Sequence, residues 1–489
     1  IHDTVRMSIG NDLKLLGCNI SMFYDGRIEV GGDIIQSDEY KESYVGVYRY
    51  FGFIMNGKKE QKIFLPHISG TIGTVDIRES KGVQLQTKLE GERLCGIEKL
   101  KAVDGTIYSD FFTNELGKDG VLDGNLECAA GGITLHNKSL TIKGNFRQNY
   151  TSTIDNDGKL VVDGNFYAKK ASVVIGNKEN DASKIHVKGN MYLRKDASVY
   201  MSSGYNKELQ VDGNLTINTN QTGGYNDNTW WGGKLILGGD LLTGKYALGK
   251  YFKRTMVILN GKKPQKIDTR RSGHNFQFLW LDLSQAEQVR FTNPNQHTFH
   301  VNGDLEQIST VALLNGGGLH TKGYYVIGAS VLQMRDPHDL LWVEGDFSMK
   351  STLNHSDQLT KGTVKLKGNF WQGGNECSFD TSDKFVISFI GDQVQKVHFD
   401  DEINSHFANV DPANADYQMD DTPWDMTARL SYHIALGIVR GFQEVFGLEN
   451  QEAFVRNLVA CLGVSFVITA IAMPEAAVMI AGEALLMVS

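Results

Sequence analysis

Residues 210–218 read QVDGNLTIN, and the five central residues, Val211-Asp212-Gly213-Asn214-Leu215, recur along the chain. The shared template, called the marker below, is an apolar residue, any residue, glycine, asparagine or aspartate, and a second apolar residue. It occurs ten times, beginning at Val30, Leu122, Ile142, Val162, Val187, Val211, Leu237, Val301, Val343 and Leu366. From Leu122 onward the first steps between copies are 20, 20, 25, 24 and 26 residues. Self-similarity at a nearly fixed period indicates a repeat architecture with one structural unit per period.

The residues between markers have the pattern of short β-strands. Residues 159–163, 183–188 and 234–237 are alternating or β-branched runs bounded by Gly, Asn and Asp. Helical periodicity is absent through most of residues 1–410. Two or three short strands in 20–26 residues predict one coil of a parallel β-solenoid, and hence a mainly β fold. Antiparallel sandwiches are disfavoured, because their strands occupy different environments and have no reason to repeat one sequence.

The marker is expected to form a corner of each coil. Val211 and Leu215 are predicted to point into the rod, while Asp212 faces water. Gly213 and Asn214 are predicted to make the bend, because glycine permits a positive φ and asparagine tolerates the left-handed region. Asparagines stacked at the same corner predict a hydrogen-bonded ladder along the solenoid. Because chemistry needs one site and not ten, we interpret the repeated marker acids as structural: Asp163, Asp212, Asp240, Asp304 and Asp346.

A second motif is nested within the first repeat. Residues 55–63 read MNGKKEQKI, residues 259–267 read LNGKKPQKI, and residues 390–397 read IGDQVQKV. Each copy begins 22 to 25 residues after the start of a marker. The chain therefore holds three copies of a larger module with simpler coils between them.

Composition narrows the classes of function. The formal net charge is −8, with 49 Lys and Arg against 57 Asp and Glu, which argues against a nucleic-acid partner. The five cysteines are scattered and no pair has C-x-x-C spacing, which argues against a disulfide framework and a structural zinc site. These cysteines are Cys18, Cys95, Cys128, Cys377 and Cys461.

The texture of the sequence changes after Pro412. Residues 412–424 form a polar, proline-marked linker, and Asp425 is a suitable N-cap for a helix over 426–446. A second helix contains the uncharged residues 458–473, and the apolar run resumes after Pro474. Sixteen apolar residues are short of a membrane span. Three interpretations stay open: core helices of a domain, membrane insertion through 458–488, or a partner-binding segment. Because the chain begins at Ile1 and stops within an apolar run, we expect a fragment of a longer protein.

Two groups of residues have metal-binding chemistry, and neither has the required spacing. Asp155-Asn156-Asp157-Gly158 resembles the start of a calcium loop, but Phe166 stands where such a loop needs glutamate. An Asx-rich turn is therefore the favoured interpretation. Four histidines are clustered in the sequence, and His297 and His300 are three residues apart. On a strand this spacing places the two side chains on opposite faces, so no shared metal is predicted. These histidines are His274, His297, His300 and His320.

Aromatic residues provide the remaining candidate site. An aromatic platform for stacking on sugars would use Tyr225, Trp230, Trp231 and Trp371, although packing or coil capping explains these residues as well. Recognised hydrolase, zinc-protease and P-loop motifs are absent from the sequence. We accordingly predict no catalytic, cofactor-binding or metal-binding residue.

Residues 344–347 (EGDF), 366–370 (LKGNF) and 395–399 (QKVHF) resemble β-solenoid repeat regions of very large secreted or surface proteins of Gram-positive bacteria. The likeness is to polymorphic-toxin-like proteins and adhesins and covers roughly residues 20–411 by pattern. In such proteins a repeat stalk precedes a pretoxin or translocation segment and a variable C-terminal effector. The resemblance implies a secreted or cell-surface location, with a C-terminal effector or secretion machinery as partners.

Three parts are therefore predicted: a solenoid at 1–411, a linker at 412–424 and an apolar helical segment at 425–489. The leading hypothesis is a non-catalytic structural and delivery scaffold that presents or encases a C-terminal effector. One alternative is a surface adhesin that binds glycans through an exposed aromatic face. The other is a polysaccharide-active β-helix enzyme, which would need clustered carboxylates and basic residues in one groove.

Overall fold

A computed structural model describes most of the chain up to residue 419. The described residues are 6–16, 20–37, 45–155, 157–201, 204, 206–219, 232–244, 252–268, 276–283, 285–292, 298–301, 303–375, 377–401, 404–411 and 417–419. The chain divides into two compact units. The first is Ile1–Asp392 with Phe399–Ala415, and the second is Gln393–His398 with Asp416–Ser489.

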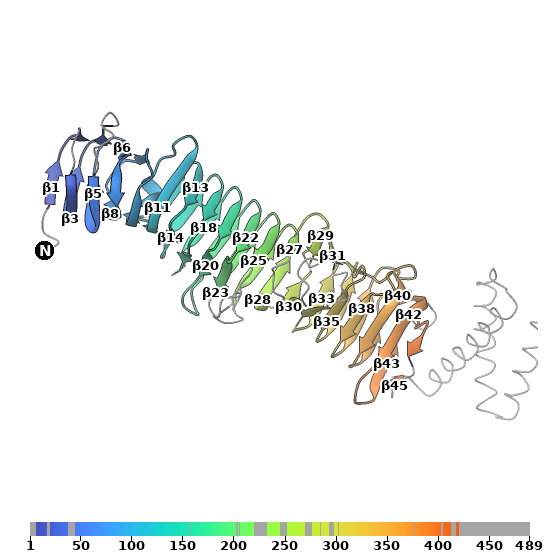
Figure 1. Ribbon diagram of the computed structural model, residues 1–489. Helices are drawn as coiled ribbons and strands as arrows, with labels where there is room; N and C mark the ends of the chain where they lie inside the picture. The colour runs from blue at the N-terminus through green and yellow to red at the C-terminus, as the bar shows by residue number, and fades with distance from the viewer. Residues whose placement is uncertain are drawn as a thin grey trace, which may run out of the picture. The chain divides into compact units, whose positions relative to one another are not determined.

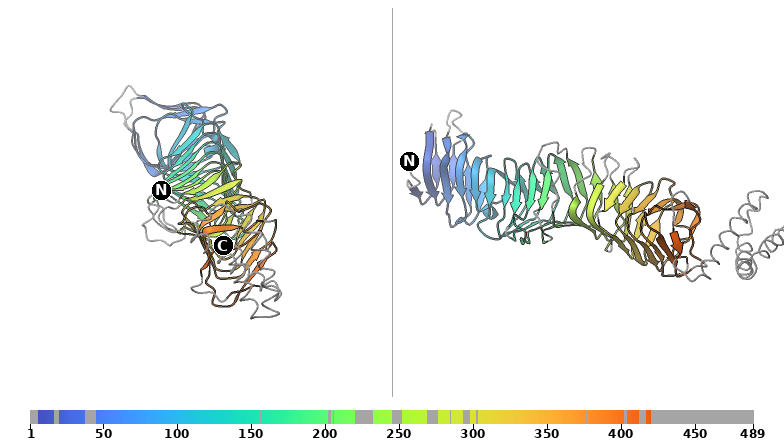
Figure 2. Two further views of the ribbon diagram at one scale, coloured as in Figure 1. Left: turned by 90° about the vertical axis from the view of Figure 1, so that its right-hand side faces the viewer. Right: turned by 90° about the horizontal axis from the view of Figure 1, so that it is seen from below.

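The first unit is a parallel β-solenoid, and the predicted mainly β fold is confirmed. Its strands stack coil upon coil from the N-terminal end onward (Figure 1; Figure 2 gives two further views). Among the described residues the ladders between its strands are parallel, and the register shows the predicted period: Phe146 pairs with Phe166, Phe166 with Met191, and Met191 with Leu215. Successive partners are therefore 20, 25 and 24 residues apart.

The strands of the first unit belong to three sheets. The largest contains β1 (Arg6–Ile9), β3 (Ile20–Val30), β5 (Val45–Met55), β7 (Ile68–Gly70), β8 (Ile72–Asp76), β10 (Glu90–Cys95), β11 (Thr106–Glu115), β13 (Asn125–Cys128), β14 (Gly132–Thr134), β16 (Phe146–Gln148), β17 (Ser152–Ile154), β19 (Phe166–Lys169), β20 (Ser172–Ile175), β22 (Met191–Lys195), β23 (Ser198–Met201), β25 (Leu215–Thr219), β27 (Leu241–Thr243), β29 (Gln265–Asp268), β31 (Gln288–Thr292), β34 (Val311–Leu313) and β37 (Val331–Gln333). The second contains β12 (Gly120–Leu122), β15 (Ser139–Ile142), β18 (Lys159–Val162), β21 (Lys184–Val187), β24 (Glu208–Val211), β26 (Lys234–Leu237), β28 (Phe252–Leu259), β30 (Phe276–Asp282), β32 (Thr298–Val301), β33 (Leu305–Ile308), β35 (Gly318–Thr321), β36 (Tyr324–Gly328), β38 (Leu340–Val343), β39 (Phe347–Ser351), β40 (Leu359–Leu366), β41 (Phe370–Gln372), β42 (Thr381–Phe389) and β44 (Val410–Asp411). The third contains β2 (Leu13–Leu15), β4 (Ile34–Gln36), β6 (Gln61–Phe64) and β9 (Val83–Leu85).

Within the second unit the structure describes residues 393–398 and 417–419. They include most of β43 (Gln395–Phe399) and all of β45 (Tyr417–Met419), which pair in parallel. Apart from β45, the predicted linker at 412–424 and apolar helical segment at 425–489 lie outside the described residues. The three-part division and the fate of residues 458–488 therefore stay predictions. A single 3-10 turn, Ile97–Lys99 (η1), is the helical element among the described residues, and no helix found there could span a bilayer.

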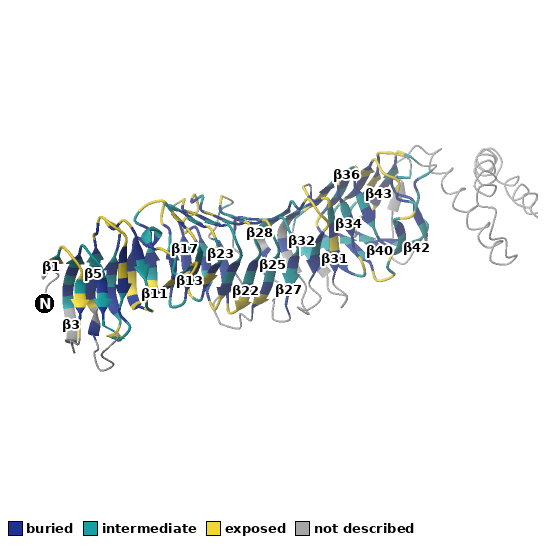
Figure 3. Ribbon diagram, turned by 90° about the horizontal axis from the view of Figure 1, so that it is seen from above, coloured by how far each residue is buried: buried dark blue, intermediate teal, exposed yellow. Residues whose placement is uncertain are grey.

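The core follows from the alternation of residues along each strand. Buried and solvent-facing residues alternate, and the buried ones of successive coils stand opposite one another (Figure 3). One such column is Leu140, Leu160, Ile185, Leu209, Leu235 and Val257, all of them buried. Aromatic residues stack in the same way, with the Phe146 and Phe166 rings 4.8 Å apart. Each coil thus covers its neighbour's apolar surface, as a repeat protein requires.

The marker forms a corner as predicted, but its glycine has a different role. Val211 and Leu215 are fully buried, and 42% of the Asp212 side chain is exposed. Among the described marker glycines only Gly124 has a positive φ in the left-handed range, so the predicted reason for glycine is wrong. Close stacking is the actual reason: a Cβ on Gly213 would lie 2.6 Å from the Asn190 Oδ1 atom and 2.7 Å from the carbonyl oxygen of Gly189.

The marker asparagines form the predicted ladder through the backbone. Each Oδ1 atom accepts a hydrogen bond from the amide N–H of the equivalent residue one coil later. The donor and acceptor are 2.7 to 2.8 Å apart in the pairs Asn145–Asn125, Asn165–Asn145, Asn190–Asn165, Asn214–Asn190 and Asp240–Asn214. Asp240 continues the ladder by accepting from the Lys266 N–H at 2.9 Å. The hydrogen bond to the next coil needs only the Oδ1 atom, which explains why both asparagine and aspartate occur at this position.

The glutamine of the second motif forms hydrogen bonds with the marker of the preceding coil. The Gln265 Oε1 atom accepts from the Gly261 N–H at 2.7 Å, and its Nε2 group donates to the carbonyl oxygens of Leu237 and Gly239 at 2.9 and 2.6 Å. Gln61 makes the equivalent contacts to Gly57, Val30 and Gly32. In these two copies the motif therefore joins two successive corners by hydrogen bonds.

Candidate functional site

The candidate calcium turn is used for joining coils. Asp155 is buried, with Oδ1 at 2.9 Å from the His136 Nδ1 atom and Oδ2 accepting from the Asn177 Nδ2 group at 2.7 Å. The Asp157 Oδ1 atom accepts from the Ala182 N–H at 2.7 Å. Because these carboxylate oxygens point at protein donors, they do not converge on a cation site. In the described part of the chain no three His, Cys, Asp or Glu side chains are placed so that together they could hold a metal ion.

The solenoid register brings together two of the four candidate histidines. His300 on β32 and His320 on β35 are direct neighbours, and their Nδ1 atoms are 2.8 Å apart. The His320 Nε2 atom is 2.8 Å from the Glu344 Oε1 atom, and the His320 ring stacks on Trp342 with 4.6 Å between centroids. His274 and His297 lie outside the described residues.

This arrangement limits how many protons the histidine pair can hold. The hydrogen bond from His320 is the largest cause that holds the pKa of Glu344 below its usual range. The two Nδ1 atoms have room for one hydrogen between them, because a second would place two N–H groups face to face. Burial, followed by the neighbouring His320, lowers the pKa of His300. The pair is thus a half-buried contact between neighbouring coils.

Sequence spacing contains a signal for this pair. His300 and His320 are 20 residues apart, which is one coil, and each comes directly before a corner. Trp342 and Lys365 occupy the same position in the next two coils. Comparing residues one coil apart, in place of near neighbours in the chain, would have predicted the contact.

Of the predicted aromatic platform, only Trp371 lies among the described residues. It is 43% exposed, and the Lys350 Nζ atom lies 5.7 Å from the ring centroid. Its direct neighbour in the preceding coil is Ser348. Tyr225, Trp230 and Trp231 lie outside the described residues.

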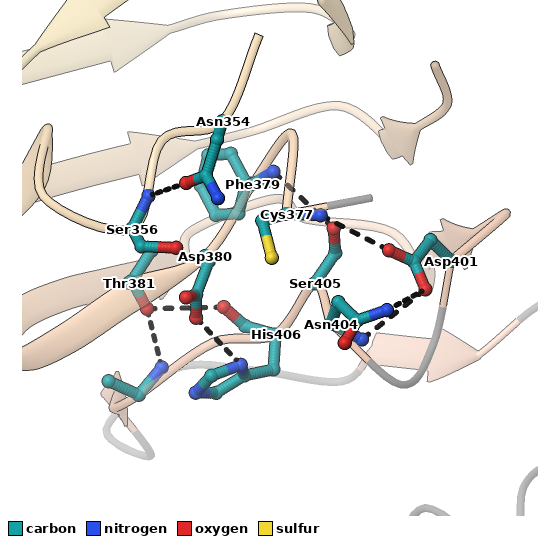
Figure 4. Close-up of polar contacts among 11 residues, drawn as sticks. Asn354, Ser356, Cys377, Phe379, Asp380, Thr381, Asp401, Asn404, Ser405 and His406 are labelled. Carbon is teal, nitrogen blue, oxygen red and sulfur yellow. Dashed lines mark hydrogen bonds and ion pairs between the residues drawn. The ribbon is translucent and has the colours of Figure 1, made fainter. Parts of the chain in front are cut away.

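A cysteine, a histidine and two aspartates gather at the corner shown in Figure 4. The His406 Nδ1 atom is 3.0 Å from the Asp380 Oδ1 atom, and the Asp401 Oδ2 atom accepts from the Cys377 N–H at 3.1 Å. These are the side-chain types of a thiol triad. However, the outer ring nitrogen of His406 and the Cys377 sulfur lie well apart on either side of Asp380 in Figure 4. Because a triad needs the base to touch the nucleophile, the cluster is better explained as another junction between coils.

A different aromatic row was missed by the sequence interpretation. Tyr167 on β19 and Tyr192 on β22 are direct neighbours whose rings are parallel within 5° and 5.0 Å apart. The Arg147 guanidinium lies 5.3 Å from the Tyr167 centroid, and the Arg194 guanidinium lies 5.4 Å from the Tyr192 centroid. We call these four side chains the Tyr–Arg strip. The signal was again their spacing of one coil, 25 residues for the tyrosines.

Comparison with known proteins finds no matching family model, no matching curated protein and no matching solved structure. The fold is therefore established by the coil register, and the function has to be argued from this chain's own side chains.

Proposed function

We propose that the chain is a non-catalytic structural scaffold, the β-solenoid stalk of a secreted or surface-located bacterial protein that presents a C-terminal effector. The secreted location and the effector rest on the sequence resemblance alone. The observation that supports a structural role is the corner ladder. From Asn125 to Lys266, the repeated amide and carboxylate oxygens each accept a hydrogen bond from the next coil.

This use of the repeated residues favours a scaffold over an enzyme. A catalytic carboxylate needs a free oxygen that faces a substrate. In the marker acids Asp240 and Asp346 the Oδ1 atom accepts a hydrogen bond from the backbone N–H of Lys266 and Asn369, respectively. Asp163 lies between Lys143 and Lys188, with Lys–carboxylate distances of 3.5 and 2.8 Å. These residues stabilise stacking, so their repetition has a structural explanation.

A scaffold sets a length, and the experiment therefore removes whole coils. Deletion of residues 125–164 joins Gly124 to Asn165 and removes two coils in register. We expect a cooperatively folded protein whose maximum dimension in X-ray scattering falls by roughly 10 Å, at ~4.8 Å per coil. The matched control, deletion of 125–154, removes one and a half coils and is expected to abolish folding, since it breaks the register.

Two outcomes would overturn the proposal. One is a two-coil deletion that unfolds as completely as the control, since a stalk of equivalent coils should tolerate it. The other is release of sugar fragments from a polysaccharide by the full chain, abolished by one carboxylate-to-amide substitution. That result would establish the polysaccharide-active enzyme in place of the scaffold.

A further inference from the structure

We propose that the Tyr–Arg strip is a binding site for an acidic polysaccharide. The strip lies on the outer face of the three neighbouring strands β16, β19 and β22. Arg147 and Arg194 are exposed, and Tyr167 and Tyr192 are partly exposed. A structural scaffold does not require this arrangement, so the inference goes beyond the proposed function.

The geometry determines which chemistry the strip offers. The Tyr167 ring lies between the Arg147 guanidinium and the Tyr192 ring, and Arg194 lies over Tyr192. The ring faces are therefore occupied by neighbours, and stacking of a sugar on a bare aromatic face is disfavoured. What remains for a ligand is the two guanidinium groups together with the tyrosine hydroxyls. Guanidinium groups bind carboxylates and sulfates through paired N–H donors, and stacking on a ring preorganises them.

The charges around the strip are strongly one-sided. Lys169, Lys170 and Lys195 are exposed beside it, and Lys169 is the direct neighbour of Arg194. Among the described residues, none of these lysines and neither strip arginine takes part in an ion pair. The nearest acids in sequence and register are Glu127, opposite Arg147, and Asp196, after Lys195. Five cations against two acids leave this face positive in a chain of net charge −8.

On the neighbouring face of these coils, by contrast, three lysines have an acidic partner. Lys143 and Lys188 both pair with Asp163, and Lys184 pairs with Glu208 at 3.4 Å. Two lysines beside the strip also have a backbone conformation that costs free energy, because φ is 56° at Lys170 and 55° at Lys195. Left-handed backbone at a non-glycine residue costs roughly 1 kcal/mol or more.

The repeat selects a linear anionic polymer as the ligand. Arg147, Lys169 and Arg194 come from three successive coils, so cations recur along the rod about every 4.8 Å. A polysaccharide with acidic groups at regular intervals matches such a row. A nucleic acid is disfavoured, because single strands bind such proteins by stacking bases on open aromatic faces. Those faces are covered here.

The test measures binding of the full chain to immobilised polygalacturonate, with neutral dextran and single-stranded poly-dT as comparison probes. We expect binding to polygalacturonate that weakens with salt and little binding to dextran. The double variant Arg147→Gln/Arg194→Gln should weaken polygalacturonate binding at least tenfold. The matched control Lys58→Gln/Lys59→Gln removes the same charge from exposed residues on a distant coil and should change binding less than twofold.

The comparison separates the outcomes. Both variants should keep the wild-type thermal midpoint, since all four side chains are exposed. The site is overturned if the full chain does not retain polygalacturonate at low salt, or if the strip variant loses no more affinity than the control. Equal or tighter binding of poly-dT, lost in the strip variant, would replace the polysaccharide with a nucleic acid. Equal binding of dextran would show that charge is not what the strip recognises.

Discussion

Two regions of the solenoid provide hydrogen-bond partners for their buried polar groups in different ways. The first is residues 122–268 and the second is residues 305–359. The first region repeats one contact at its marker corners, where an Oδ1 atom accepts from the amide of the next coil, alongside single buried contacts such as that of Ser152 with Gln148. In the second region the buried polar side chains have partners that differ from coil to coil. Gln307, Ser330, Ser351 and His355 are all fully buried.

Each polar residue of the second region has its own partners. The Gln307 Nε2 group donates to the carbonyl oxygens of Thr310 and Val331 at 2.8 Å, and its Oε1 atom accepts from the Tyr324 hydroxyl. The Ser351 hydroxyl donates to the Ser330 carbonyl oxygen at 2.7 Å. The comparison teaches that a solenoid can hold its coils together by repetition or by single, locally fitted networks. Only the first leaves a period in the sequence.

The largest expected effect comes from a substitution that disrupts the stacked marker corner. Gly213→Val places a Cβ and two methyl groups against Gly189 and the Asn190 side chain, where a Cβ alone lies within 2.7 Å of two oxygens. We expect a loss of roughly 3–5 kcal/mol in unfolding free energy, because the stacked backbones cannot separate without opening both coils. Urea denaturation followed by circular dichroism measures this loss.

The control for this substitution is the adjacent residue. Asp212→Ala removes contacts at 2.8 Å to His186 and Gln210 on the exposed side of the same corner. We expect a change of less than about 1 kcal/mol, as for other exposed pairs. Similar losses for the two variants would show that the corner is not fixed by close backbone stacking.

The second prediction sharpens the contrast through pH. His355 is buried, with its Nε2 atom accepting from the Leu332 N–H at 3.1 Å and its Nδ1 atom 2.9 Å from the Leu353 carbonyl oxygen. Burial is the main cause that lowers the pKa of His355 from about 6.5 to about 4, and no charged side chain contributes. The folded state therefore favours the neutral ring. The contribution of this preference to the free energy of unfolding is complete above pH 6.5. It is lost as the pH falls toward 4, and the total loss is about 3 kcal/mol.

Hydrogen exchange at pH 7 and pH 4.5 checks this prediction. Acidification should reduce protection of the Leu332 amide more than that of the Asn214 amide, which bonds to an asparagine oxygen. In His355→Gln the ring is absent, so the additional loss at low pH should disappear. If the variant keeps the wild-type pH dependence, another group, such as His300, is responsible for the acid sensitivity.

The repeated part of the fold could be predicted from the sequence because one corner appears ten times. The period, the parallel solenoid and the inward positions of Val211 and Leu215 all follow from it. The reason for the glycine could not be predicted, since contact between stacked backbones is invisible in a single coil. The same applies to the pairs Tyr167–Tyr192 and His300–His320, which form only when strands one coil apart come into register.

The smallest expected effect tests whether the ladder uses only an oxygen. The Asn190 Oδ1 atom accepts from the Asn214 N–H at 2.7 Å, and Asp240 has the same role in a later coil. Asn190→Ala leaves that partly buried amide without its acceptor and should cost about 1–2 kcal/mol of unfolding free energy. Asn190→Asp keeps the acceptor and should stay within about 0.5 kcal/mol of wild type. Equal losses for the two would mean that the asparagine Nδ2 group matters, and the presence of aspartate at Asp240 in the same ladder would need another explanation.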